Sequence, residues 1–247
     1  MRSPIELLKT AWTTYKQKFW IFIGYTGWLL VPIAAFLLLI NLDNKYSAIG
    51  YVILTIAYIV ISTIIVTILF RLSNASLLNT PVDDKALQDN LVQTAKNMLL
   101  TSLLVALAVF GGLLLLIIPG LVFIVWFGFA QIISVLEDKK PLAALTRSKE
   151  LVTNRFWPIA WRLISGPVVI GVIYGIIFSI IVALIAIGTG MDLEILLEAE
   201  QPPAWVILID TLGDVLMIPL LVLYLTALYH DLVAKKDKVL DKAAEIA

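Results

Sequence analysis

The sequence predicts an all-α, polytopic membrane protein with six transmembrane helices, forming a single integral membrane domain over residues 1–247. Of its 247 residues, 61% are hydrophobic and 15% are charged, whereas about half of a soluble domain is apolar. The apolar residues form continuous runs of about 20 residues, the length of a helical span, whereas barrel strands are about 10 residues long and alternate in polarity. These observations exclude a soluble globular fold and argue against an outer-membrane barrel.

One apolar run is too long for a single span. Residues 98–136 contain no charged side chain, and one helix of that length would measure roughly 58 Å against a hydrocarbon core of about 30 Å. Pro119 and Gly120 lie near its middle, and proline lacks a backbone donor while glycine accepts a positive φ. We therefore predict a hairpin that turns there. The six predicted spans are 19–40, 50–70, 98–118, 121–136, 163–187 and 205–228.

The distribution of basic residues supports this hairpin, because cytoplasmic loops are enriched in Lys and Arg. With six spans, one side of the membrane holds every one of the 18 basic residues except Lys45. A single span in place of the hairpin would divide them far more evenly. We therefore predict that both termini are cytoplasmic.

Three segments outside the spans are polar but have helical periodicity, which predicts amphipathic interfacial helices over 4–18, 81–96 and 141–156. The first has Ser3 and Glu6 in capping-box spacing and Pro4 at the first helical position. In the second, Thr80 and Pro81 take the corresponding places. The apolar face predicted for the first helix consists of Leu8, Trp12, Tyr15 and Phe19.

Each interfacial helix precedes a pair of spans, which predicts a threefold pseudo-repeat with units 1–70, 80–136 and 140–230. The first and third units share identities at corresponding positions, and chance identity is the alternative explanation. The pairs are Pro4 and Pro141, Leu8 and Leu145, Phe19 and Phe156, and Trp20 and Trp157.

Two stretches resemble a known family. The segment IIPGLVFIVWFGFAQIISVLEDKKPLAALTRSKELVTNRFW, with the ending TALYHDLV, is similar to the membrane domain of some bacterial glycerophosphoryl diester phosphodiesterases and to related stand-alone inner-membrane proteins. The resemblance implies a six-span domain in the bacterial cytoplasmic (inner) membrane, without an active site. His230 and Val233 depart from the pattern. The matching positions are Ile118, Pro119, Gly120, Glu137, Arg147, Ser148, Tyr229 and Asp231.

Patterns typical of enzymes are not found in the sequence. It contains no P-loop, nucleophile elbow, H-E-x-x-H or dinucleotide-binding glycine pattern, and it has no cysteine and one histidine, His230. We therefore expect a non-enzymatic protein without catalytic residues, cofactor or metal. Its expected partners are membrane lipids, anionic at the cytoplasmic face, or a protein, and no nucleic acid.

Two sets of residues are candidate sites. The first is the basic group that we expect to face lipid headgroups or a partner: Lys139, Lys140, Arg147, Lys149 and Arg155. The second is the acid pair Asp210 and Asp214, which lies on one face of the sixth span and favours the alternative function, a small proton- or cation-coupled transporter. In the fifth span, small residues recur every fourth position and predict close helix packing, with a substrate path as the rival reading. They are Gly171, Gly175, Ser179 and Ala183.

Overall fold

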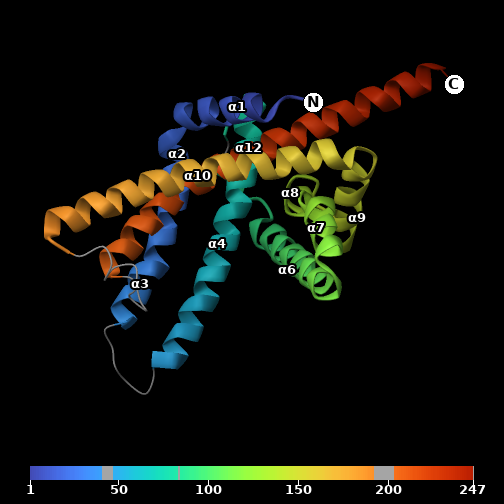
Figure 1. Ribbon diagram of the computed structural model, residues 1–247. Helices are drawn as coiled ribbons and strands as arrows, with labels where there is room; N and C mark the ends of the chain where they lie inside the picture. The colour runs from blue at the N-terminus through green and yellow to red at the C-terminus, as the bar shows by residue number, and fades with distance from the viewer. Residues whose placement is uncertain (41–46, 83, 192–202, 247) are drawn as a thin grey trace.

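The computed structural model describes residues 1–40, 47–82, 84–191 and 203–246, and these residues form helices joined by short turns (Figure 1). The α-helices are α1 (Pro4–Gln17), α2 (Phe19–Thr26), α3 (Leu30–Ile40), α4 (Ser47–Leu77), α5 (Asp84–Gln88), α6 (Leu91–Leu115), α7 (Ile117–Phe127), α8 (Ala130–Leu136), α9 (Pro141–Val152), α10 (Phe156–Thr189) and α12 (Ala204–Ile246). Short 3₁₀ turns, η1 (Gly27–Leu29) and η2 (Thr153–Arg155), join α2 to α3 and α9 to α10.

Six helical segments of the described chain are long and apolar enough to cross a membrane, which confirms the predicted all-α, six-span fold. They are Phe19–Leu38, Ile49–Leu77, Leu91–Leu115, Ile117–Leu136, Pro141–Thr189 and Ala204–Lys235. Large apolar side chains remain exposed along them, such as Ile176 and Ile180 of α10. Lipid chains are as apolar as these side chains, so such a surface suits a bilayer. The threefold repeat stays a prediction.

α1 begins with the predicted capping box. Ser3 Oγ accepts a hydrogen bond from the Glu6 N–H at 3.2 Å, and Glu6 Oε2 accepts one from the Ser3 N–H at 2.8 Å, which satisfies two donors at the helix start. The predicted apolar face is displaced by about one residue, because Trp12 is 48% exposed. The side chains of α1 that pack inward are Leu7, Ala11 and Tyr15.

The long apolar run folds back, as predicted, but the turn lies at Leu116 instead of Pro119-Gly120. Leu116 is extended (φ −163°, ψ 148°) and separates α6 from α7. Pro119 lies in the first turn of α7, where a missing N–H breaks no intrahelical bond. Gly120 is helical, and a Cβ there would lie 2.9 Å from the backbone nitrogen of Leu113. The glycine therefore allows α6 and α7 to approach closely. The prediction that Gly120 takes a positive φ at the turn was wrong.

The predicted helix 81–96 is replaced by a different arrangement. Only the short α5 forms before a turn at Asn90 (φ 47°), and residues 91–96 are the first turns of the long α6. Thr80 does not cap a helix start, because its hydroxyl is directed back to the Ala75 carbonyl at 3.2 Å. Its N–H donates to the same carbonyl at 3.0 Å, and Asn79 before it has a positive φ of 53°. That pattern is a Schellman motif, which ends α4.

Arg71 near the end of α4 organises the turn that follows. Its Nη1 donates to the carbonyls of Leu87 (2.9 Å) and Asp89 (2.6 Å), and its Nη2 donates to Thr94 Oγ1 at 2.8 Å. These bonds satisfy carbonyls at the end of α5 that have no helical partner. The guanidinium that ends this span is thus held by the protein's own backbone.

A proline inside α12 is compensated by a side chain from α2. Pro219 has no N–H to donate to the Val215 carbonyl one turn earlier. The hydroxyl of Thr26, which is fully buried, donates to that carbonyl at 2.9 Å. A freed backbone acceptor in an apolar bundle therefore finds a partner on a neighbouring helix.

The helices α10 and α12 pack as antiparallel neighbours through glycines that the sequence pattern did not single out. A Cβ at Gly166 would overlap the ring of Tyr224, and one at Gly213 would overlap Tyr174. A Cβ at Gly171 or Gly175 would meet nothing within 4 Å. The prediction that the small residues of the fifth span pack closely against another helix is therefore wrong in the described structure.

Candidate functional site

A polar cluster forms around residues 229–231 of α12. The Tyr229 hydroxyl donates to Glu137 Oε1 at 2.8 Å, and His230 Nε2 lies 2.8 Å from Asn74 Oδ1, an acceptor. Asp231 Oδ2 accepts from the backbone N–H of Arg2 at 3.0 Å. These three consecutive residues join segments that are far apart in sequence, and we call the cluster the polar junction. Its members are Arg2, Asn74, Glu137, Arg147, Tyr229, His230 and Asp231.

The polar junction tests the predicted topology independently of charge. It brings together the end of α4, the corner between α8 and α9, the end of the sixth span and the start of α1. Arg162 near the start of α10 joins them, because its Nε donates to the Arg2 carbonyl at 2.8 Å. The hairpin prediction requires all these segments to lie on one side of the membrane. The contacts place them at one end of the helical bundle, and N lies beside α12 in Figure 1.

Glu137 has three partners in and beside the polar junction. Besides Tyr229, its carboxylate contacts Arg147 Nε at 3.3 Å and Lys139 Nζ at 3.4 Å. Burial alone would raise the pKa of Glu137, but the Tyr229 hydrogen bond, the Arg147 charge and the hydrogen bonds from Arg147 and Lys139 outweigh burial. The pKa of Glu137 is therefore lowered, and the group is held as a carboxylate.

The sequence predicted one continuous span over 121–136, but the helix breaks between α7 and α8. Ser148 binds the backbone at this break. Its buried hydroxyl donates to the Trp126 carbonyl at 2.7 Å and accepts from the Phe129 N–H at 3.2 Å. Both backbone groups lie at the break, where the regular helical ladder stops. Ser148 and Arg147 are adjacent residues of α9, so this helix is anchored to the break and to Glu137 at once.

The structure places the five predicted basic residues in different settings. Lys139 and Arg147 pair with Glu137, and Lys149 Nζ lies 4.4 Å from the centre of the Trp126 ring, a cation–π distance. Lys140 and Arg155 make no such contact within the described residues. Their role toward lipid or a partner stays a prediction, and the group does not form one convergent patch.

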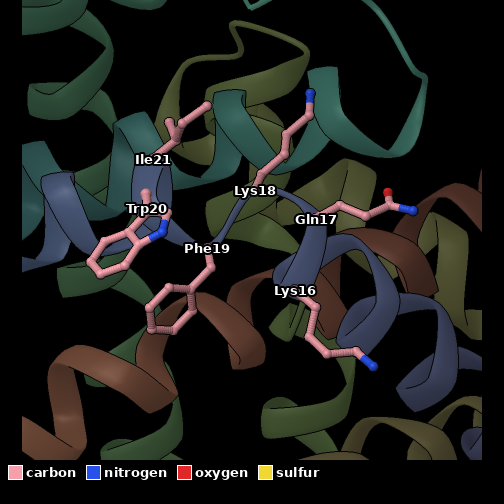
Figure 2. Close-up of a pocket in the computed structure, with 6 residues that line it drawn as sticks. All are labelled: Lys16, Gln17, Lys18, Phe19, Trp20 and Ile21. Carbon is pink, nitrogen blue, oxygen red and sulfur yellow. The ribbon is translucent and has the colours of Figure 1, made fainter.

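The elbow between α1 and α2 forms a surface hollow that the candidate residues did not include. It has a volume of about 450 Å³ and is lined by residues 16–21 (Figure 2). Figure 2 shows the side chains of Lys16 and Lys18 pointing away from one another, with Trp20 on the opposite side from Gln17. Trp20 is 81% exposed. The elbow presents separate cations and an aromatic ring, without groups that converge on one ligand.

The acid pair is only partly satisfied by the protein. The Tyr174 hydroxyl of α10 donates to Asp210 Oδ1 at 2.6 Å, whereas Asp214 makes no hydrogen bond or ion pair to a described residue. Both carboxylates lie on α12, one turn apart. A tyrosine therefore holds one acid, and whether the pair acts as a site stays a prediction. Among the described residues, no group of three His, Cys, Asp or Glu side chains comes together to hold a metal ion.

Residues 48–232 match the model of a family described as Domain of unknown function (DUF7847). The chain belongs to this family. The matched part of the DUF7847 protein includes the whole polar junction except Arg2, and α1 precedes it. No curated protein and no solved structure matches the chain.

Proposed function

We propose that this DUF7847 protein is a non-enzymatic, multi-pass protein of the bacterial cytoplasmic membrane that binds anionic lipid headgroups at the end marked by the polar junction. One observation supports this most. Exposed lysines (Lys9, Lys16, Lys140 and Lys149) and exposed tryptophans (Trp12, Trp20, Trp157 and Trp161) occur together on α1, the elbow, α9 and the start of α10. Tryptophan favours the membrane interface, and lysines near it attract anionic lipids.

The similarity to the phosphodiesterase membrane domains is a second part of the proposal. Five of the positions that carry it lie in the polar junction or beside it: Glu137, Arg147, Ser148, Tyr229 and Asp231. Arg147 and Tyr229 meet at Glu137, and Ser148 braces the α7–α8 break. A motif made of mutual contacts would hold one end of the bundle together in both groups of proteins. A protein partner at the same basic end is the alternative ligand.

The lipid proposal is tested by removing the basic residues that have no acidic partner. We expect the triple variant Lys140→Gln, Lys149→Gln, Arg155→Gln to retain less phosphatidylglycerol after purification in mild detergent. Each charge near an anionic surface contributes about 1 kcal/mol, or about fivefold. Lipid per protein, measured by mass spectrometry, provides the readout. Lys45→Gln, on the predicted opposite side, is the control, and equal retention in all forms would contradict headgroup binding.

The proposed orientation is tested by accessibility, because the natural chain contains no cysteine. We expect Ser3→Cys, Asn90→Cys, Lys149→Cys and Lys242→Cys to be shielded from an impermeant thiol reagent in intact cells. Asn44→Cys and Glu198→Cys, which lie outside the described residues, should react. Labelling of Lys149→Cys in intact cells would overturn the hairpin topology with cytoplasmic termini.

The alternative function, a proton- or cation-coupled transporter, is supported by the Tyr174–Asp210 hydrogen bond between two spans. Ionisable groups inside a membrane are costly and are commonly functional. If Asp210 and Asp214 bind a cation, the double variant Asp210→Asn, Asp214→Asn should abolish any cation-dependent rise in thermal stability. Asp89→Asn, outside the spans, is the control, and a rise that persists in the double variant would exclude the acid pair as the site.

A further inference from the structure

An apolar groove of about 310 Å³ lies between α1, α10 and α12. All of its lining side chains are hydrophobic: Leu8, Trp12, Val169, Ile170, Ile173, Ile177, Met217 and Leu220. Along α10 it extends from Val169 to Ile177, about 12 Å at 1.5 Å per residue. Its length along α10 and its wholly hydrophobic lining therefore suit an extended hydrocarbon.

A cation of α1 borders this groove. Lys16 Nζ lies 5.6 Å from the centre of the Trp12 ring, and Trp12 lines the groove. Lys9 lines a different surface hollow, together with Thr13 and Asn79. An occupant of the groove with a negative group at its α1 side would therefore meet Lys16.

We propose that the groove holds one acyl chain of an anionic glycerophospholipid, with the phosphate against Lys16. The inference rests on the proposed function, since it names a second place where this end of the protein binds anionic lipid. An acyl chain is favoured because the groove combines a wholly hydrophobic lining with a cation on one border. That combination complements a molecule with one apolar and one anionic part.

The groove is tested by filling it. Ile173→Trp and Val169→Phe place larger side chains in the groove, and we expect each to retain about tenfold less tightly bound phosphatidylglycerol, which corresponds to ~1.4 kcal/mol. Ile176→Trp is the matched control, because Ile176 is on the same helix with similar exposure, 56% against 52% for Ile173, and does not line the groove. Native mass spectrometry of the full chain in mild detergent, with added phosphatidylglycerol or phosphatidylcholine, gives the readout.

The headgroup is tested with Lys16→Gln, and Lys9→Gln, at a residue that lines a different hollow, is the control. We expect Lys16→Gln to lower the preference for phosphatidylglycerol over phosphatidylcholine more than Lys9→Gln does, and equal effects of the two variants would place the phosphate elsewhere. Equal losses in Ile173→Trp and Ile176→Trp would mean that the lipid is part of the general annulus, and would overturn the proposal. If the natural protein elutes as a dimer and Ile173→Trp as a monomer that keeps its lipid, the groove is covered by a second copy of the chain and the lipid proposal is overturned.

The experiments distinguish the failure of the groove proposal from the failure of headgroup binding at α9. If the groove variants retain all their lipid but the α9 triple variant does not, the groove is overturned and headgroup binding at α9 stands. If the groove variants lose lipid but the α9 triple variant does not, the groove is supported and α9 is excluded. Monodisperse elution and an unchanged helical circular dichroism spectrum establish that each variant is folded.

Discussion

Replacing Glu137 by alanine is expected to lower the unfolding temperature of the detergent-purified protein by about 4–12 °C. The substitution removes the acceptor of the Tyr229 hydroxyl and leaves Arg147, only 23% exposed, without its carboxylate. Stranding a partly buried charge and a hydroxyl costs ~2–3 kcal/mol, and for a chain of this size each kcal/mol shifts the midpoint by about 2–4 °C. Thermal unfolding in one detergent measures the effect.

Glu150→Ala is the matched control for this experiment. Glu150 is an exposed residue of the same helix as Arg147, and it makes no hydrogen bond or ion pair with the described residues. Surface substitutions of this kind change stability by about 0.5 kcal/mol or less. If Glu137→Ala and Glu150→Ala unfold at the same temperature, Glu137 does not hold the end of the bundle together.

The lowered pKa of Glu137 adds a pH dependence with a definite sign. The Tyr229 hydrogen bond and the basic partners outweigh burial and lower its pKa in the folded protein. Its stabilisation is therefore complete above the unfolded-state pKa of about 4.3 and is lost as the pH falls through the lower folded-state pKa. The difference in unfolding temperature between the natural protein and Glu137→Gln should shrink as the pH is lowered through that range.

The sequence was sufficient for features that depend on composition and local pattern. Apolar runs have the length of a bilayer, so the six spans follow from counting. The Ser3–Glu6 capping box is a local motif that the structure reproduces. The basic residues indicated that the long run folds back, because only a hairpin gathers nearly all of them on one side. Contacts at the polar junction agree with that arrangement.

Features that depend on pairing between distant segments were not predictable. Asn79 and Asn90 with positive φ replace an expected helix by a turn, and the carbonyls that Arg71 binds there are set by the fold. In α1, Leu8 and Trp12 are four residues apart, and so are Leu7 and Ala11. The spacing alone therefore does not show which face of the helix packs inward. Tyr229 and Glu137 are distant in sequence, and no periodicity relates them. The polar junction was therefore missed as a unit, although several of its residues carried the family resemblance.

The sequence pattern also did not show which glycines of α10 pack closely against α12. Gly166 and Gly171 form a matched pair that tests this packing. Gly166→Ala should destabilise the protein by ~1–3 kcal/mol, the usual cost of overpacking a core. The added Cβ would overlap the Tyr224 ring, which is fully buried and whose hydroxyl donates to the Arg162 carbonyl at 2.6 Å. Burial and this hydrogen bond therefore oppose a shift of the ring. Thermal unfolding in detergent measures the loss.

Gly171→Ala in the same helix should not destabilise the protein. Its Cβ would meet nothing within 4 Å, and alanine favours a helix over glycine by about 1 kcal/mol, so we expect an unchanged or higher unfolding temperature. Tyr224→Leu adds a second check, since it removes the ring and should make the further change Gly166→Ala less costly than in the natural protein. If Gly166→Ala and Gly171→Ala behave alike, α10 and α12 do not meet at Gly166 and Tyr224, and the packing of the last two spans would have to be different.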